Sequence, residues 1–105
     1  MLASQKKASP EESKELRLAL GTWLKGQREA KNLSQRDLAD ILGLEYYTFI
    51  SQLENGRGKI PSSRYLDWAD ALGVEPRAFV QNLLMHYDPM TYSILFDAPR
   101  NNAPC

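Results

Sequence analysis

The sequence predicts an all-helical domain, with five or six short helices packed around one core. Apolar residues recur at the three- and four-residue spacing of amphipathic helices along most of the chain. Serine or aspartate beside proline marks several helix starts, and glycine marks several helix ends. At 105 residues, with 43% hydrophobic and 25% charged residues, the chain has the size and composition of one globular domain.

The first helix is predicted to begin at Pro10. Ser9 is placed to act as its N-cap, Pro10 suits the first helical position, and Glu12 can complete a capping box. Apolar residues then recur at helical spacing, at Leu16, Leu20, Trp23 and Ala30.

Two glycines inside this helix, Gly21 and Gly26, leave its path open. Each weakens a helix by about 1 kcal/mol relative to alanine. Such a cost is tolerated where another backbone approaches the glycine closely. The alternative is a break that makes residues 10–20 a separate arm.

The second helix is predicted over Gln35 to Leu42, with Ser34 as its N-cap and Gly43 as its C-terminal stop. Its expected inward residues are Leu38, Ile41 and Leu42. The third helix is predicted from about Tyr46 to Glu54, where the turn residues Asn55-Gly56 end it.

The fourth helix follows a loop that spans residues 56–62. Ser62 or Ser63 is expected to cap this helix, and Gly73 to close it. Its inward side is expected to hold Tyr65, Leu66, Ala69 and Leu72.

Pro76 is expected to open a fifth helix, whose apolar stripe comprises Phe79, Val80, Leu83, Leu84 and Tyr87. Asp88 and Pro89 repeat the pattern of an N-cap followed by a first helical residue, and they start a sixth segment. Residues 90–96 of this segment include Thr, Tyr, Ile and Phe, which also favour strands. The sequence therefore leaves helix and strand open there.

Charge is unevenly distributed along the chain, although the net charge is zero. Residues 1–64 carry eleven of the thirteen Lys and Arg residues but only eight of the thirteen Asp and Glu residues. The zero total argues against a strongly basic nucleic-acid coat protein. The uneven distribution nevertheless predicts a positive surface on the N-terminal side.

The sequence shows no segment that would direct the chain to a membrane. No apolar run approaches the roughly 18–20 residues that a membrane span requires. Lys6 and Lys7 are not followed by the apolar stretch of a secretory signal. The single cysteine, Cys105, fits a reducing compartment, so we expect a cytoplasmic protein.

Residues with reactive side chains do not form a recognisable catalytic or metal site. His86 is the one histidine, and neither a second histidine nor a cysteine stands near it in the sequence. We find no nucleophile with a matching base and no glycine-rich phosphate loop after a strand. Trp23 and Trp68 are interpreted as packing residues. We therefore predict no enzymatic activity, no metal and no cofactor.

The third predicted helix has two contrasting faces. Phe49, Ile50 and Leu53 share one side, with Tyr46 at its edge. The opposite side holds Tyr47, Thr48, Ser51, Gln52 and Asn55. These side chains are hydroxyls and amides without a Lys or Glu among them, whereas a solvated helix face is normally charged. Because Arg57 and Lys59 follow directly, this face is interpreted as a surface that reads a partner.

Three motifs, in this order and spacing, resemble the helix-turn-helix of phage repressors and Cro-type regulators, the XRE family. They are S-Q-R-D-L-A-D-I-L-G in the second helix, I-S-Q-L-E-N-G in the third and A-D-A-L-G-V before the fifth. The resemblance covers roughly residues 20–87. It implies a phage-repressor-like DNA-binding domain of five helices over residues 20–88. A tail with a helical extension over residues 1–19 would precede this domain, and a C-terminal segment over residues 89–105 would follow it.

The resemblance implies that the third helix lies in the major groove of DNA and the second crosses the backbone. The expected base-reading residues are Tyr47, Thr48, Ser51 and Gln52, while Tyr46 is expected at the edge of the core. Gln52 is the strongest candidate, because a carboxamide pairs bidentately with adenine. From Gly43 to Glu54 the chain is one residue longer than the commonest family pattern, so the turn is longer or the helix starts earlier.

The resemblance also assigns contacts to the DNA backbone and an internal ion pair. Gln35, at the start of the second helix, is expected to meet a phosphate. The other expected backbone contacts are Asn55, Arg57, Lys59 and Arg64. Arg28 and Glu54 match a pair that in this family locks the third helix against the first.

Family members usually act as two-fold dimers, so the resemblance predicts a homodimer. The expected interface comprises Leu83, Leu84, Tyr87, Tyr92, Ile94, Leu95 and Phe96. The alternative is that residues 90–96 fold back and cover the core of one protomer.

Two classes of function follow from these observations. The first is a transcriptional regulator, a repressor that binds an inverted repeat in double-stranded DNA as a homodimer. The second is a protein-interaction module, such as an antitoxin or adaptor that retains the fold, which the zero net charge favours slightly. For residues 1–19 three roles stay open: an extension of the first helix, an arm that touches DNA through Lys6 and Lys7, or packing on a second subunit.

Overall fold

The structure, a computed structural model, describes residues 9–97. Within this range all regular structure is helical, which confirms the predicted fold class. The elements are α1 (Pro10–Ala30), α2 (Gln35–Leu42), α3 (Thr48–Glu54), the short 3-10 helix η2 (Ser62–Arg64), α4 (Tyr65–Leu72), α5 (Pro76–Tyr87) and α6 (Pro89–Phe96). The expectations about residues 1–8, with Lys6 and Lys7, and about residues 98–105, with Cys105, lie outside the described range.

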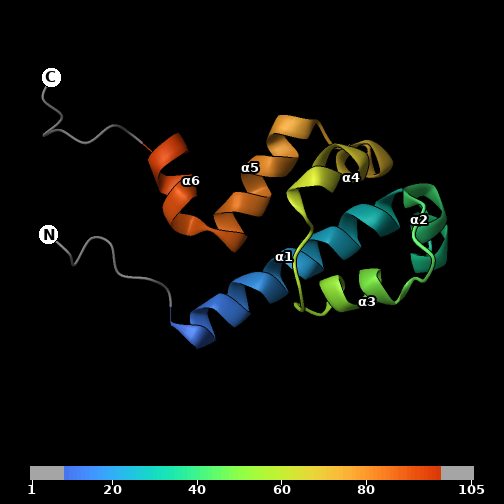
Figure 1. The fold of residues 1–105 in the computed structure, drawn as a ribbon, viewed down its shortest axis with the longest axis horizontal. Coiled ribbons are helices and arrows are strands. Elements are labelled where there is room, and N and C mark those ends of the chain that lie inside the picture. The colour runs from blue at the N-terminus through green and yellow to red at the C-terminus, as the bar shows by residue number, and fades with distance from the viewer. Residues whose placement is uncertain (1–8, 98–105) are drawn as a thin grey trace, which may run out of the picture.

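The long helix α1 is continuous from its predicted start at Pro10. The Ser9 hydroxyl accepts a hydrogen bond from the Glu12 amide at 3.1 Å, and the Glu12 carboxylate accepts one from the Ser9 amide at 2.8 Å. The helix passes through Gly21 and Gly26 without a break, so residues 10–20 are not a separate arm. Figure 1 shows α1 running diagonally through the molecule, with α3 beside it.

One of the two glycines in α1 marks a close backbone approach. A Cβ atom at Gly21 would lie 2.6 Å from the carbonyl oxygen of Glu54, and it would also collide with the carbonyl oxygen of Leu53. At Gly26 no heavy atom of a neighbouring element lies within 4 Å of such a Cβ. The alternative of close approach therefore holds for Gly21 alone, where α3 rests on the α1 backbone.

The core lies where α1, α4 and α5 meet, with α2 and α3 closing one end of the domain. Its buried apolar residues are Leu20, Leu24, Leu38, Ala39, Leu42, Ile50, Leu53, Ile60, Trp68, Ala69, Leu72, Phe79 and Leu83. Trp68 is 2% exposed, and the Trp23 ring packs 6.0 Å from the Phe79 ring. Both tryptophans are packing residues, as interpreted from the sequence.

Two of the predicted inward residues are wrong. Ile41 is 55% exposed and Leu66 is 59% exposed, while Ala39 and Trp68 are buried in the same helices. Each exposed residue stands two positions from a buried one, and two positions on an α-helix correspond to about 200° of rotation. The pattern of apolar residues alone did not define which side of α2 and α4 is buried. The contacts of these helices with the rest of the domain decide it.

Most predicted helix ends are confirmed by the geometry of their caps. Ser34 and Asp37 form a capping box at α2, and Gly43 and Gly73 take left-handed φ angles of 70° and 69° at the ends of α2 and α4. The predicted serine cap of α4 is wrong, because the chain makes the turn η2 first and α4 then begins without a side-chain cap. Residues 89–96 form a helix, which settles the choice left open by the sequence.

The capping box of α2 makes part of the stability dependent on pH. Hydrogen bonds from the Ser34 amide and hydroxyl hold the pKa of the Asp37 carboxyl below its ordinary value of 3.8. Because this pKa is lowered by folding, the stabilisation is present above about pH 3.8 and is lost as the pH falls through the folded pKa. We expect an NMR titration to place the Asp37 midpoint below 3.8, and Asp37→Asn to weaken the acid dependence of unfolding. An Asp37 midpoint at or above 3.8 would contradict this prediction.

Candidate nucleic-acid interface

Helices α2 and α3 are joined by a turn that holds the extra residue of this sequence. Gly43 ends α2, and α3 begins only at Thr48. The predicted start of the third helix at Tyr46 is therefore wrong, because Tyr46 and Tyr47 belong to the longer turn. Tyr46 is 67% exposed, so the expectation of a ring at the edge of the core is also wrong. Helix α3 is therefore about two helical turns long, from Thr48 to Glu54.

A buried polar network fixes α3 against α1 and α2. The Arg28 Nε donates to Glu54 Oε2 at 2.7 Å, and its Nη2 donates to Glu54 Oε1 at 3.1 Å. Arg28 Nη1 also donates to the Leu33 carbonyl oxygen at 2.6 Å. Arg28 is 6% exposed and Glu54 is 8% exposed. The hydrogen bond that Arg28 donates to Glu54 is the main cause that raises the pKa of Arg28, so the guanidinium stays charged.

Gln35 joins this network from the start of α2. Its side-chain Nε2 donates to Glu54 Oε1 at 2.9 Å, and the residue is half-buried. A carboxamide nitrogen carries two donor hydrogens. Gln35 can therefore hold Glu54 with one hydrogen and offer the other outward, beside the N-terminus of α2.

The outward face of α3 presents polar, uncharged side chains. Thr48, Gln52 and Asn55 are exposed and Ser51 is half-buried. The Asn55 Nδ2 donates to the Ser51 carbonyl oxygen at 2.8 Å, so this amide closes the last turn of the helix. The geometry thus leaves Gln52 as the exposed carboxamide in the middle of the face.

Tyr47 lies just before this face and contacts Arg36, a residue that was not among the predicted site residues. The guanidinium of Arg36 lies 5.2 Å from the centroid of the Tyr47 ring, and both residues are exposed. This distance is that of a cation–π contact. The signal in the sequence was an arginine directly after Gln35 in the first turn of α2.

The loop after α3 carries two exposed cations, Arg57 and Lys59. Its glycines Gly56 and Gly58 take left-handed φ angles of 80° and 75°, a conformation that other residues rarely adopt. These angles let the loop turn tightly. The Lys59 Nζ lies 5.5 Å from the centroid of the Tyr87 ring. The loop is therefore turned back toward the end of α5.

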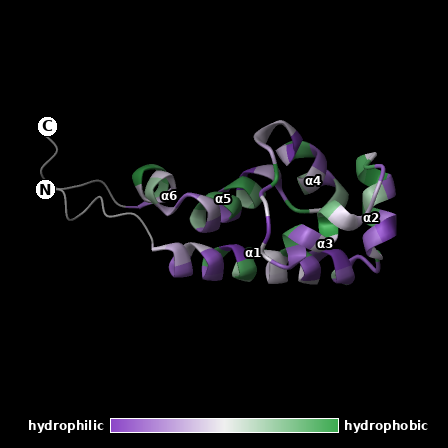
Figure 2. Cartoon of the chain, turned by 60° about the horizontal axis from the view of Figure 1, so that its bottom comes forward, coloured by the Kyte–Doolittle hydropathy of each residue, from purple (hydrophilic) through white to green (hydrophobic). Residues whose placement is uncertain are grey.

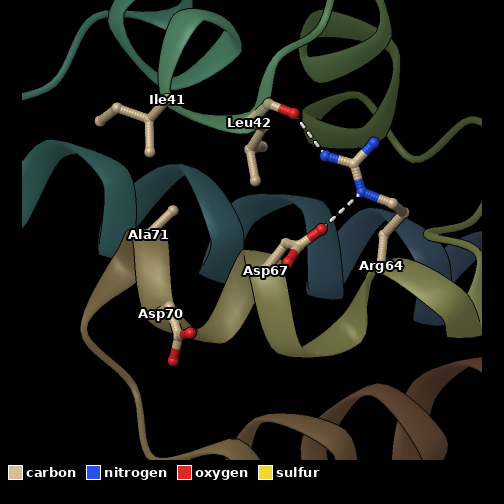
Figure 3. Close-up of a pocket in the computed structure, with 6 residues that line it drawn as sticks. All are labelled: Ile41, Leu42, Arg64, Asp67, Asp70 and Ala71. Carbon is tan, nitrogen blue, oxygen red and sulfur yellow. Dashed lines mark hydrogen bonds and ion pairs between the residues drawn. The ribbon is translucent and has the colours of Figure 1, made fainter.

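Arg64 is bound within the protein and does not project from the loop. Figure 3 shows its guanidinium between α2 and α4, directed at the Leu42 carbonyl oxygen and at Asp67. The distance from Arg64 Nε to Asp67 Oδ2 is 2.9 Å, and the side chain borders a pocket that also includes Ile41, Asp70 and Ala71. Arg64 thus satisfies the C-terminal end of α2, and its contact to the DNA backbone stays a prediction.

The residues expected at the dimer interface divide into three groups. Leu83 is 0% exposed and lies in the protomer's own core, so it has no surface for a second copy, and this expectation is corrected. Leu84, Tyr87 and Tyr92 are half-buried. Ile94, Leu95 and Phe96 on α6 are exposed. Figure 2 shows hydrophobic colouring on part of α6, next to paler and hydrophilic segments.

Among the described residues the structure gives no indication of a metal site or of a membrane-spanning helix. Residues 9–97 contain no group of three or more His, Cys, Asp or Glu side chains placed to hold a metal ion. His86 Nδ1 lies 2.9 Å from the Asn82 carbonyl oxygen in its own helix. None of the helices in this range combines the length and the apolar character needed to cross a membrane.

The model of the helix-turn-helix family matches residues 24–79 of this chain. The matched stretch runs from the second half of α1 into α5, and it includes the network of Arg28, Gln35 and Glu54 as well as the outward face of α3. No curated protein matches the sequence. The order of the helices, the buried network and the family match agree, and the chain belongs to the XRE-type helix-turn-helix family of DNA-binding proteins.

Proposed function

We propose that this protein is a repressor that binds an inverted-repeat operator as a homodimer. Membership of the family implies DNA binding and a role in transcriptional regulation. The observation that carries the finer proposal is the outward face of α3. Its exposed groups are hydroxyls and amides, the buried pair of Arg28 and Glu54 holds it rigidly, and exposed cations follow it. Such a face suits base edges flanked by phosphates.

In this proposal α3 lies in the major groove and Gln52 is the central base reader. Its exposed carboxamide can donate to N7 and accept from N6 of adenine, which is worth about 1–3 kcal/mol of discrimination. Tyr47 and Thr48 contact bases at the start of the helix. Ser51 is half-buried, so only the exposed part of its hydroxyl is proposed to contact a base.

The proposed contacts to the DNA backbone come from both helices of the motif. Gln35 and Arg36 stand in the first turn of α2, where the helix N-terminus favours a phosphate. Asn55, Arg57 and Lys59 stand at the end of α3 and in its loop. Cations on both sides of a neutral reading face position the helix without specifying sequence.

The proposed dimer surface is the exposed apolar side of α6. Ile94, Leu95 and Phe96 supply its centre, and the half-buried residues Leu84 and Tyr92 border it. Exposed apolar side chains grouped on one helix favour association with a second copy. Two-fold symmetry then places the half-sites one helical turn apart, about 34–36 Å, or a multiple of this distance.

Selection of bound duplexes from a random DNA pool at physiological salt tests this proposal. We expect an inverted repeat to be enriched, with a half-site spacing that reports the distance between the two α3 helices. Absence of any enriched sequence with folded, concentrated protein would contradict the proposal. That outcome would favour the protein-interaction module, in which the helix-turn-helix acts as a scaffold.

A matched pair of variants separates base reading from backbone binding. We expect Gln52→Ala to relax the preference at one base pair of each half-site by about 1–3 kcal/mol. We expect Lys59→Ala to weaken specific and random DNA alike, and to reduce the salt dependence by one phosphate contact. Both are measured by fluorescence anisotropy over a salt series. An equal loss on specific and random DNA for Gln52→Ala would show that Gln52 is not a reader.

A further inference from the structure

Tyr87, the last residue of α5, contacts the loop that follows α3. Its hydroxyl accepts a hydrogen bond from the Ile60 amide at 3.3 Å. Its ring lies under the Lys59 ammonium, 5.5 Å from ring centroid to Nζ. A single side chain thus engages two consecutive residues of the loop, from a position 27 residues further along the chain than Ile60.

The loop depends on such an anchor because of its own sequence. Gly56 and Gly58 have left-handed φ angles, and the residues between and after them are exposed up to Lys59. Glycine restricts its own backbone weakly, so these residues do little to define the direction of the loop. The start of the loop lies against α1, where Gly56 packs on the Leu18 backbone. Its later part is tied to the core by Ile60, which is 2% exposed, and by the Tyr87 hydroxyl on the Ile60 amide.

The surroundings of Tyr87 are consistent with this assignment. Burial raises the pKa of the Tyr87 phenol, so the hydroxyl stays protonated and neutral. The carboxylate of Asp88 is close enough to Lys59 for the lysine to contribute to lowering the pKa of Asp88, after the hydrogen bonds from Thr91. Lys59 therefore lies over the Tyr87 ring face at the end of α5, where its charge also acts on the Asp88 carboxylate.

We propose that Tyr87 is a positioning residue for DNA binding, which holds Lys59 and the Ile60 amide so that the loop after α3 meets the DNA backbone. The proposal rests on the proposed function, because it concerns the phosphate contact of Lys59. It also removes Tyr87 from the expected dimer surface, since its ring and hydroxyl are engaged by the loop of the same protomer. Tyr87 lies beyond residues 24–79, the stretch that matches the family model.

The first test is a double-mutant cycle with Tyr87→Leu and Lys59→Gln, measured on random-sequence duplex over a salt series. We expect Tyr87→Leu to lower the affinity roughly three- to tenfold and to make the log–log salt slope shallower by about 0.9 for each protomer. In the Lys59→Gln background the same substitution should leave the slope unchanged. Losses that add in full would show that Tyr87 does not act through Lys59, and would overturn the proposal.

Tyr87→Phe provides a second test that does not require the loss of the ring. This variant keeps the aromatic face under Lys59 and removes only the hydroxyl, so we expect a salt slope between those of the wild-type protein and Tyr87→Leu. Hydrogen exchange at the Ile60 amide should become at least about tenfold faster, because its acceptor is lost. An Ile60 amide that exchanges at the wild-type rate would overturn the proposal.

Val80→Ala is the control for a general loss of stability. Val80 is a half-buried residue of the same helix that packs against the core. We expect it to lower the melting temperature without changing the salt slope. A slope that also becomes shallower in Val80→Ala would overturn the specific role of Tyr87.

Wild-type protein that binds no DNA would contradict the proposed function itself, whereas wild-type binding with an unaltered slope in Tyr87→Leu would contradict this inference alone.

Discussion

Glu54→Ala is expected to destabilise the domain by about 3–5 kcal/mol, the usual cost of removing one partner of a buried ion pair. The substitution leaves the guanidinium of Arg28 buried at 6% exposure, without the two hydrogen bonds at 2.7 and 3.1 Å. It also removes the acceptor of the Gln35 side chain. Thermal unfolding should therefore show a melting temperature lower by more than about 12 °C.

Glu29→Ala is the matched control for this prediction. Glu29 also approaches Arg28, at 4.0 Å, but its side chain is 59% exposed. Exposed ion pairs contribute little, so we expect the melting temperature to stay near that of the wild-type protein. An unchanged melting temperature in Glu54→Ala would show that the network does not lock α3 to the core.

A double replacement distinguishes an unpaired charge from lost packing. Arg28→Met combined with Glu54→Leu removes both charges and keeps the volume roughly constant. Apolar replacement of a whole buried pair is often neutral for stability. We expect the double variant to recover much of the stability that Glu54→Ala loses, and to bind DNA more weakly because Gln35 no longer has its acceptor.

Gly21→Ala is expected to destabilise the protein, although alanine is the better helix former. The new Cβ would lie 2.6 Å from the carbonyl oxygen and 2.8 Å from the carbonyl carbon of Glu54. These are backbone atoms, which cannot move aside as a flexible side chain can, so α3 must shift away from α1. Overpacking of this kind costs about 1–3 kcal/mol, and urea unfolding measures it as a lower midpoint at unchanged slope.

Gly26→Ala provides the matched contrast within the same helix. Its Cβ would meet no heavy atom of a neighbouring element within 4 Å, so the helix propensity of alanine should stabilise the domain by up to about 1 kcal/mol. The two substitutions are chemically identical and are expected to have opposite signs. A Gly21→Ala variant as stable as Gly26→Ala would contradict the close packing of α3 on α1.

The Arg28–Glu54 pair and Gly21 act on the same feature, the position of α3 on α1. The buried pair ties the end of α3 to α1 and α2, and Gly21 allows its backbone to approach. A helix of only two turns, such as α3, has little stability of its own. Its direction therefore depends on these contacts, and damage to either should reduce DNA affinity more than the loss of stability alone predicts.

Much of the architecture was determined by the sequence itself, because it depends on residues that are close in the chain. Ser9, Ser34 and Asp88 cap helices whose first turns follow directly, and Gly43 and Gly73 end helices through their own φ angles. The family motifs likewise lie within short segments. They were sufficient to predict the helix-turn-helix and the partners Arg28 and Glu54.

Only the tertiary structure decided which side of each short helix is buried and which polar groups are engaged. Ile41 and Leu66 looked inward by composition and are exposed, whereas Leu83 is buried too deeply to meet a second copy. Arg64 binds the end of α2, and Tyr87 holds the loop after α3. Each outcome depends on groups more than twenty residues apart or on the rotation of one helix against another. Local periodicity and capping carry no information about contacts between distant residues or about helix rotation, because tertiary packing determines both.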